Sequence, residues 1–103
     1  MASRTRLSET DIKRRLKALP RWSLQKKKLH RELRFADFSH AFGFMSAAAL
    51  IAEGMNHHPE WFNVWATVKI DLSTHDAGGV TELDFALAAK MEVLASELGA
   101  LKS

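Results

Sequence analysis

The stretch Trp61–Leu72, which reads WFNVWATVKIDL, decides the fold of this 103-residue chain. Its side chains alternate between apolar and more polar, the period of two that is typical of a β-strand. One predicted face holds Phe62, Val64, Ala66, Val68, Ile70 and Leu72, and the other holds Trp61, Asn63, Trp65, Thr67, Lys69 and Asp71. An unbroken strand of this length would extend about 40 Å. We therefore predict a bend, bulge or turn within it, or an end that projects to pair with a neighbour.

Two shorter strands and three helices are predicted around this segment. Alternation predicts strands over Arg21–Gln25 and Leu29–Phe35, and apolar residues at helical spacing predict helices over residues 9–19, 38–55 and 82–98. Strands gathered in adjacent pairs favour an α+β, two-layer sandwich, with an antiparallel sheet of about four strands and three helices packed on one face. The predicted order is α-β-β-α-β-β-α. We predict a single domain over residues 1–103, since no linker or repeat divides the chain.

The helix predicted over residues 38–55 is apolar on more than one side. Its main face is predicted to hold Phe38, Ala41, Phe42, Met45, Ala48, Ala49 and Ala52, while Phe44, Ala47 and Ile51 lie on another side. A helix that is apolar on two sides is usually buried on two sides. In so small a domain we expect the second cover to be another subunit, as in a homodimer or homotetramer.

Composition excludes several kinds of site. The chain is 47% hydrophobic and 26% charged, as in ordinary globular proteins, and it has no cysteine. Disulfides, thiolate metal sites and a cysteine nucleophile are therefore excluded. The N-terminus lacks the apolar core of a secretory signal, and the longest apolar run, Ala41–Ala52, is shorter than the roughly 20 residues that span a bilayer. We expect a soluble, cytoplasmic protein with no membrane partner.

Charge is distributed unevenly along the chain. Residues 1–34 hold 12 Lys and Arg against 3 Asp and Glu, whereas residues 35–103 hold 3 against 9. A basic segment can bind nucleic acid or another anion. Here the aromatic residues are not interleaved with the basic ones as they are in a single-strand binding platform. The simpler interpretation is a solvated surface, so we do not expect direct nucleic-acid binding.

Three histidines mark the candidate site. His57 and His58 stand before Pro59 in the stretch EGMNHHPEWF, residues 53–62, and His75 follows the long alternating segment. A turn or bend in that segment would bring His75 back toward the pair. Adjacent side chains in an extended chain point to roughly opposite sides, so His57 and His58 are expected to have different roles.

These histidines allow three interpretations: packed or solvated loop residues, a zinc site, or an acid–base site. Three histidines can bind zinc, but adjacent histidines are a poor geometry for one ion, and the spacing lacks the i, i+4 pair of a helical zinc motif. Imidazole gains and loses a proton near neutral pH, so several in one pocket could protonate a leaving group and remove a proton elsewhere. The acid–base interpretation is favoured, and no metal is expected.

Three further side chains are candidates for the same site. Glu53 lies one helical turn before His57, so a contact that orients this imidazole is predicted if the helix persists that far; otherwise Glu53 is a surface carboxylate. Trp61 either stacks on a flat heterocycle or packs at the sheet edge. Thr81 is predicted to cap the last helix with Asp84 at its third position, and Asp84 either serves that cap or reaches the site.

In their order and spacing these residues resemble the pterin-4a-carbinolamine dehydratases. The resemblance rests on Glu53, the run His57-His58-Pro59-Glu60-Trp61, Trp65, the run Ser73-Thr74-His75-Asp76, and Asp84, with the flanking stretches 38–45 and 63–65, and it covers roughly residues 8–98. One departure is Asn56, where some relatives carry an aspartate. Asparagine keeps an acceptor but has no charge, so an electrostatic role does not carry over to this position.

The resemblance implies an activity and a set of roles. Members of the family eliminate water from a 4a-hydroxytetrahydropterin, left by aromatic amino acid hydroxylases, to give quinonoid dihydropterin, and they need no cofactor or metal. By resemblance, His57 and His75 are the catalytic proton-transfer residues. The implied substrate-binding residues are His58, Glu53, Trp61, Ser73, Thr74 and Asp84. Relatives also serve as a dimerisation cofactor of a homeodomain transcription factor, so the alternative is a coactivator or a non-catalytic binding module, which in a eukaryote would also be nuclear.

Overall fold

The structure is a computed structural model that describes residues 4–102. Its helices are α1 (Glu9–Arg15), α2 (Phe38–Met55) and α3 (Glu82–Glu97), and short 3₁₀ turns cover Leu16–Ala18 and His75–Ala77. Its strands are β1 (Ser23–Gln25), β2 (Lys28–Arg34), β3 (Glu60–Val64) and β4 (Thr67–Leu72). Within the described range no helix is both long and apolar enough to cross a membrane.

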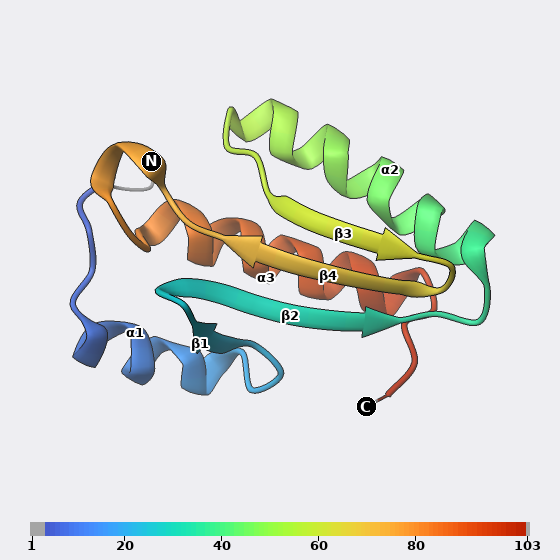
Figure 1. Cartoon of the computed structure of the whole chain (residues 1–103), viewed down its shortest axis with the longest axis horizontal. Helices are drawn as coiled ribbons and strands as arrows, with labels where there is room; N and C mark the ends of the chain where they lie inside the picture. The colour runs from blue at the N-terminus through green and yellow to red at the C-terminus, as the bar shows by residue number, and fades with distance from the viewer. Residues whose placement is uncertain (1–3, 103) are drawn as a thin grey trace.

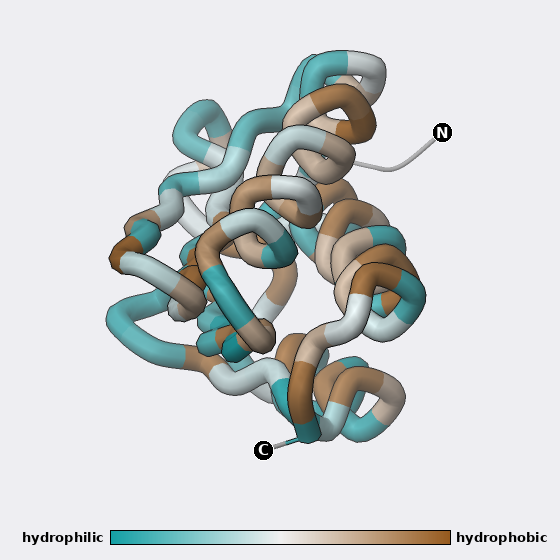
Figure 2. Tube along the Cα trace, turned by 90° about the vertical axis from the view of Figure 1, so that its right-hand side faces the viewer, coloured by the Kyte–Doolittle hydropathy of each residue, from teal (hydrophilic) through white to brown (hydrophobic). Residues whose placement is uncertain are grey.

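The four strands form one antiparallel sheet in the order β1-β2-β4-β3. Figure 1 shows α3 behind the central strands, with α1 near the β1 edge and α2 near the β3 edge. Figure 2 views the molecule end-on from the turn between β3 and β4, and the coils of helix lie to one side of the strands. The α+β two-layer prediction and the order α-β-β-α-β-β-α are therefore confirmed.

The long alternating segment is broken by a tight hairpin turn, as its length predicted. Val64 pairs with Thr67, so only Trp65 and Ala66 lie in the turn, and Trp65 has a positive φ of 49°. The side-chain amide of Asn63 holds the turn by donating to the carbonyl oxygens of Trp65 at 3.1 Å and Thr67 at 2.9 Å. The strand that begins after the histidine pair therefore returns as β4 toward the same end of the molecule.

The prediction that all six apolar residues share one face is wrong for β3. Val68, Ile70 and Leu72 are buried, but Phe62 and Val64 are each 57% exposed on the opposite face. The two-residue turn places Phe62 opposite Lys69 and Trp61 opposite Ile70. Facing residues on antiparallel strands point to the same side of a sheet. Even-numbered β3 residues therefore share a face with odd-numbered β4 residues, and the predicted pattern reverses at the turn.

The predicted main face of α2 is also partly wrong. Its buried residues are Ala41, Phe44, Ala48 and Ala52, with Phe44 packed 5.5 Å from Phe35 between ring centroids. Three residues of the predicted face, Phe38, Phe42 and Ala49, are exposed instead. Because α2 is apolar around much of its circumference, spacing alone does not select the face that the sheet covers.

A charged cluster lies between β2 and α3. Arg31 is only 4% exposed, and its guanidinium donates to Glu92 at 3.0 and 3.1 Å. The indole of Trp22 donates to the same carboxylate at 2.8 Å. Burial alone would raise the pKa of Glu92, but the hydrogen bonds from Arg31 and Trp22 outweigh burial and lower this pKa. Glu92 is therefore an ionised carboxylate held against a permanent cation.

A second polar cluster lies on the opposite face of the sheet from Arg31, because neighbouring residues of β2 point to opposite faces. The ring nitrogens of His30 lie 2.8 Å from Asp71 and 3.0 Å from Glu32. Burial by itself lowers the pKa of His30, but the hydrogen bonds to Glu32 and Asp71, and their charges, raise this pKa overall.

Candidate active site

The end of α2 separates the two adjacent histidines. The helix stops at Met55, and Asn56 takes a left-handed conformation with φ 50° and ψ 43°. The amide of His57 then bonds the carbonyl oxygen of Ala52 at 3.0 Å. Asparagine tolerates this backbone region better than most residues. Asn56 therefore has a structural role, because it redirects the chain so that His57 turns inward and His58 stays exposed.

His57 is fixed by a buried carboxylate. Its side chain is 7% exposed, and its Nε2 lies 2.5 Å from Oδ1 of Asp84, which is fully buried. The other oxygen of Asp84 accepts hydrogen bonds from the Thr74 hydroxyl and the Thr81 amide, each at 2.9 Å. The Thr74 and Thr81 hydroxyls are also bonded to each other at 2.7 Å. Asp84 thus fulfils both predicted alternatives, since it completes the capping box of α3 and reaches the histidine.

This contact leaves one ring nitrogen of His57 available. No hydrogen bond in the described part of the chain involves its Nδ1. In residues 4–102, every buried side-chain nitrogen or oxygen has a hydrogen-bond partner. Nδ1 is therefore the ring atom through which His57 meets solvent or a ligand. A carboxylate at one ring nitrogen fixes which tautomer the other nitrogen presents.

His58 is held by a different carboxylate. Its Nε2 lies 2.7 Å from Oε1 of Glu53, and both side chains are exposed. The condition for a contact between Glu53 and His57 is therefore not met, and Glu53 is the surface carboxylate of the other interpretation. The helix does not persist to residue 57, and the left-handed Asn56 carries His57 away from the α2 surface while His58 comes beside Glu53.

His75 lies in the short 3₁₀ turn that follows β4, and its side chain is 83% exposed. Its Nε2 is 3.5 Å from Oε2 of Glu60, an ion-pair contact that is long for a hydrogen bond. The hydrogen bond from Lys28 at 2.5 Å is the main cause that lowers the pKa of Glu60. The loop closes on itself through a bond from the Thr74 amide to the Gly79 carbonyl at 2.9 Å.

All three histidines line one hollow of about 280 Å³. Its lining residues are Arg4, Asn56, His57, His58, Ser73, Thr74, His75 and Asp76. The predicted set of His57, His58, His75, Ser73 and Thr74 is thus brought together. Asp84 lies behind His57, and Glu53 lies beside His58. Trp61 is not a lining residue; it packs against the core instead.

Three lining residues, Asn56, Asp76 and Arg4, were not predicted for this site, and Asn56 entered the sequence analysis only as a departure from the family. Asp76 follows His75 directly, so the neighbouring histidine was a usable signal. Arg4 lies before the first helix, in a segment without periodicity or motif, and sequence gave no reason to place it beside the histidines.

Each of the three imidazoles around the hollow has its own carboxylate partner. These pairs are His57 with Asp84, His58 with Glu53, and His75 with Glu60. No group of three or more metal-ligating side chains in residues 4–102 is placed to hold a metal ion. Imidazoles that each lie beside a carboxylate are an arrangement that proton-transfer sites commonly use.

Three comparisons with known proteins agree. The family model for pterin 4 alpha carbinolamine dehydratase matches residues 5–94. A protein of Solibacter usitatus (strain Ellin6076), named provisionally as a pterin-4-alpha-carbinolamine dehydratase, is 60% identical over 92 residues, which cover 89% of this chain and 97% of that protein. A protein of Rhizobium johnstonii with the same provisional name is 50% identical over 93 residues, with coverage of 88% and 92%.

Solved structures extend the likeness to the fold. A Brucella melitensis protein described as a transcriptional coactivator/pterin dehydratase is 46% identical, with a TM-score of 0.86 and coverage of 88% of this chain and 99% of its own. A pterin dehydratase-like protein described as a RuBisCO assembly factor in the alpha-carboxysome is 30% identical, with a TM-score of 0.60 and coverage of 72% and 88%. With its fold, its histidine hollow and its relatives in agreement, this chain belongs to the pterin-4-alpha-carbinolamine dehydratase family.

Proposed function

We propose that the protein eliminates water from a 4a-hydroxytetrahydropterin to give the quinonoid dihydropterin, in the recycling of the pterin cofactor of aromatic amino acid hydroxylases. One observation carries this proposal. His57, backed by the buried Asp84, opens through Nδ1 toward the same hollow as His58 and His75. Several imidazoles around one bound molecule are the equipment that an acid–base elimination requires.

The reaction breaks two bonds on neighbouring atoms of the pterin. The electrons of the N5–H bond form the C4a=N5 double bond, and the C4a–O bond breaks as the hydroxyl leaves. An acid must protonate the leaving hydroxyl, and a base must take the N5 proton, so the net product besides the dihydropterin is water. His57 and His75 carry these two transfers, and His58 binds the substrate. Ser73 and Thr74 shape the wall of the hollow.

Kinetics of single variants test this proposal. The 4a-hydroxypterin is generated in situ, its dehydration is followed by absorbance, and the uncatalysed rate is subtracted. We expect His57→Ala and His75→Ala to lower kcat/KM by about 10²- to 10⁴-fold, the usual contribution of a general acid or base. His40→Ala is the matched control, because His40 lies on α2 and pairs with Asp37 outside the hollow. Unchanged rates in both site variants would refute the assignment, as would loss of activity on chelation with recovery on adding zinc.

A second function, binding of partners, is favoured by the outer surface of α2. Phe38, Phe42 and Leu50 are exposed on this helix, and the first two rings pack 5.7 Å apart between centroids. Exposed apolar patches mark association surfaces. We assign this surface first to a second copy of the chain, in a homodimer or homotetramer, and second to a transcription-factor partner, since the Brucella relative is described as a transcriptional coactivator. Light scattering after size exclusion tests self-association, and a monomer at micromolar concentration would refute it.

A further inference from the structure

The segment before α1 lies along the loop that carries His75. The Leu7 amide donates to the Val80 carbonyl at 2.8 Å, and the Arg4 guanidinium lies 3.6 Å from the Asp76 carboxylate. Arg6 covers Gly79 so closely that a Cβ at this glycine would come within 2.8 Å of the arginine Cδ. Residues 4–7 are therefore packed against the far side of the loop, and we refer to them as the N-terminal strap.

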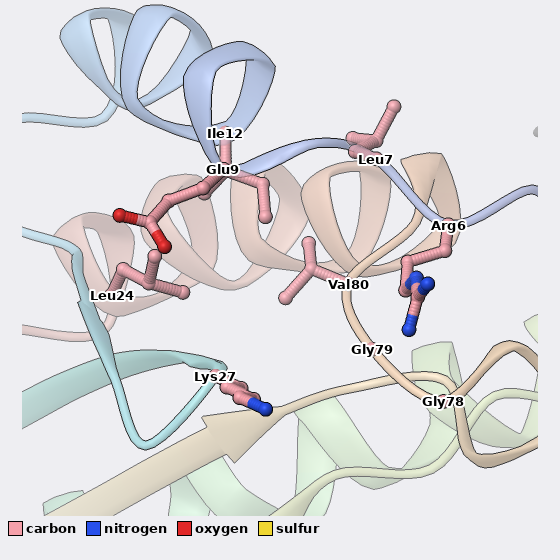
Figure 3. Close-up of a pocket in the computed structure, with 9 residues that line it drawn as sticks. All are labelled: Arg6, Leu7, Glu9, Ile12, Leu24, Lys27, Gly78, Gly79 and Val80. Atoms are coloured by element: carbon pink, nitrogen blue, oxygen red, sulfur yellow. The ribbon is translucent and has the colours of Figure 1, made fainter.

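Figure 3 shows how the strap is placed. Leu7 and Arg6 lie beside Val80, Gly79 and Gly78, over a neighbouring hollow of about 160 Å³ that contains no histidine. Arg4, two residues earlier, instead lines the hollow of the three histidines. The strap thus contributes lining residues to two hollows, Arg6 and Leu7 to one and Arg4 to the candidate active site.

Arg4 differs in charge and hydrogen bonding from the other lining residues. It is the one permanent cation among the described residues that line the histidine hollow. Its only ion-pair partner among them, Asp76, lies beyond hydrogen-bond distance at 3.6 Å, and the two side chains are 49% and 80% exposed. A guanidinium has five N–H donors in a planar fork, and a carboxylate is an acceptor only. Side by side, Arg4 and Asp76 present donors next to an acceptor.

This pattern is complementary to one edge of a pterin. On the pyrimidinone ring the C4 carbonyl oxygen accepts a hydrogen bond, and the adjacent N3–H donates one. The C4 carbon is bonded to C4a, where the proposed elimination occurs. A pair that recognises the C4 edge must therefore lie beside an imidazole that acts at C4a, and Asp76 directly follows His75.

We propose that Arg4 and Asp76 form a specificity-determining pair, in which Arg4 donates to the C4 carbonyl oxygen of the pterin and Asp76 accepts from N3–H. This inference rests on the proposed dehydratase function, because that function names the ligand. The strap holds Arg4 in place through its contacts with Val80 and Gly79. Arg4 binds ground state and transition state alike, so its loss raises KM and leaves kcat near its original value.

Equilibrium binding provides a test that does not depend on turnover. The probes are pterin and 2,4-diaminopteridine, in which an amino group replaces the C4 oxygen, and binding is followed by quenching of the pteridine fluorescence. We expect the unmodified protein to prefer pterin by about 100-fold, because 2,4-diaminopteridine lacks both the C4 oxygen and N3–H and each hydrogen bond to a charged group is worth about 10-fold. Arg4→Ala should reduce the preference to about 10-fold, since Asp76 remains, and Arg4→Lys should restore part of the loss. His57→Ala should keep the preference, because His57 does not contact the C4 edge.

Two further variants make the outcome decisive. Arg14→Ala removes an exposed arginine that pairs with Asp11 outside the hollow, and it should change nothing. Gly79→Ala pushes the strap outward and should weaken the preference for pterin without changing a charged side chain. If Arg4→Ala discriminates as well as the unmodified protein, the pair is refuted while the dehydratase proposal stands. If the unmodified protein binds neither probe at millimolar concentration, both proposals are refuted.

Discussion

Helix α3 carries two inward-facing carboxylates whose partners differ. Asp84, in the first turn, is bonded to His57, Thr74 and the α3 cap. Glu92, two turns later, is bonded to Arg31 and Trp22. Both sites hold a hydrogen-bonded carboxylate on the inner side of α3. They differ in whether the partner can change its own charge.

Arg31 stays charged at any pH at which the protein is folded, so its pair with Glu92 has one state and holds the layers together. An imidazole changes charge near neutral pH, and His57 has a ring nitrogen free beside a hollow. A buried carboxylate therefore serves structure when it faces a permanent cation. Asp84 instead faces a titratable group that lines the hollow, which is why we propose a role in proton transfer for this pair.

The largest effect is expected from Asp84→Asn. The oxygen of the new amide can still accept from Thr74 and Thr81, which turns its NH₂ group toward His57. The imidazole must then accept at Nε2, so its proton moves to Nδ1 and the wrong tautomer faces the hollow. We expect kcat/KM to fall by on the order of 10³-fold while the fold is kept. Full activity in this variant, with an unchanged unfolding transition, would show that the pair with His57 has no part in proton transfer.

The next effect is expected from Glu92→Gln, which leaves the charge of Arg31 buried without a counter-ion. Breaking a buried ion pair in this way costs about 3 kcal/mol of unfolding free energy. Denaturant unfolding measures this loss, and Glu97→Gln, the same change at an exposed position of α3, should cost far less. Activity per folded molecule should be unchanged. A loss of activity in Glu92→Gln would contradict the assignment of Glu92 to stability and of Asp84 to proton transfer.

The smallest effect is expected at His30, a titratable group with carboxylate partners that does not line the histidine hollow. The folded-state pKa of His30 is raised above the reference value of 6.5, so its stabilising contribution is fully present below that pH. It is lost as pH rises through the folded-state pKa. His30→Gln should therefore cost about 0.5 kcal/mol more near pH 5 than near pH 9, a small value because solvent at the exposed Glu32 and the partly exposed Asp71 screens the contacts of the largely buried imidazole.

Measuring the unfolding free energy of both proteins at the two pH values checks this sign. Asp71 and Glu32 remain in the variant, so the difference isolates the imidazole. A pH-independent difference would contradict the raised pKa. A change in kcat/KM would contradict the placement of His30 outside the site.

The sequence predicted those parts of the molecule that follow from local pattern. The length of the alternating segment required a break, and that break is the turn at Trp65 and Ala66. Which face each half of the segment presents depends on how many residues form the turn. The sequence does not reveal that number, so Phe62 and Val64 were placed on the wrong side.

Prediction of the site was limited in the same way. The His57, His58 and His75 set was identified from sequence, and the hollow brings it together. The carboxylate beside His57 and the one beside His58 depend on a single left-handed residue, Asn56, which places His58 rather than His57 next to Glu53. Arg4 lines the hollow because the segment before α1 contacts the loop around Val80, which is distant along the chain. No local sequence pattern encodes such a contact.

The strand order has a consequence for how the protein refolds. The β3–β4 hairpin is local and should close within about 10 μs. In contrast, β2 pairs with β4 only after the whole of α2 and β3 has been looped out between them. Such non-local pairing is slow, because the entropy of closing the loop is lost before any contact compensates for it. His57 meets Asp84 across a similar separation. Catalytic activity should therefore return with the last kinetic phase of refolding, later than most of the helical signal.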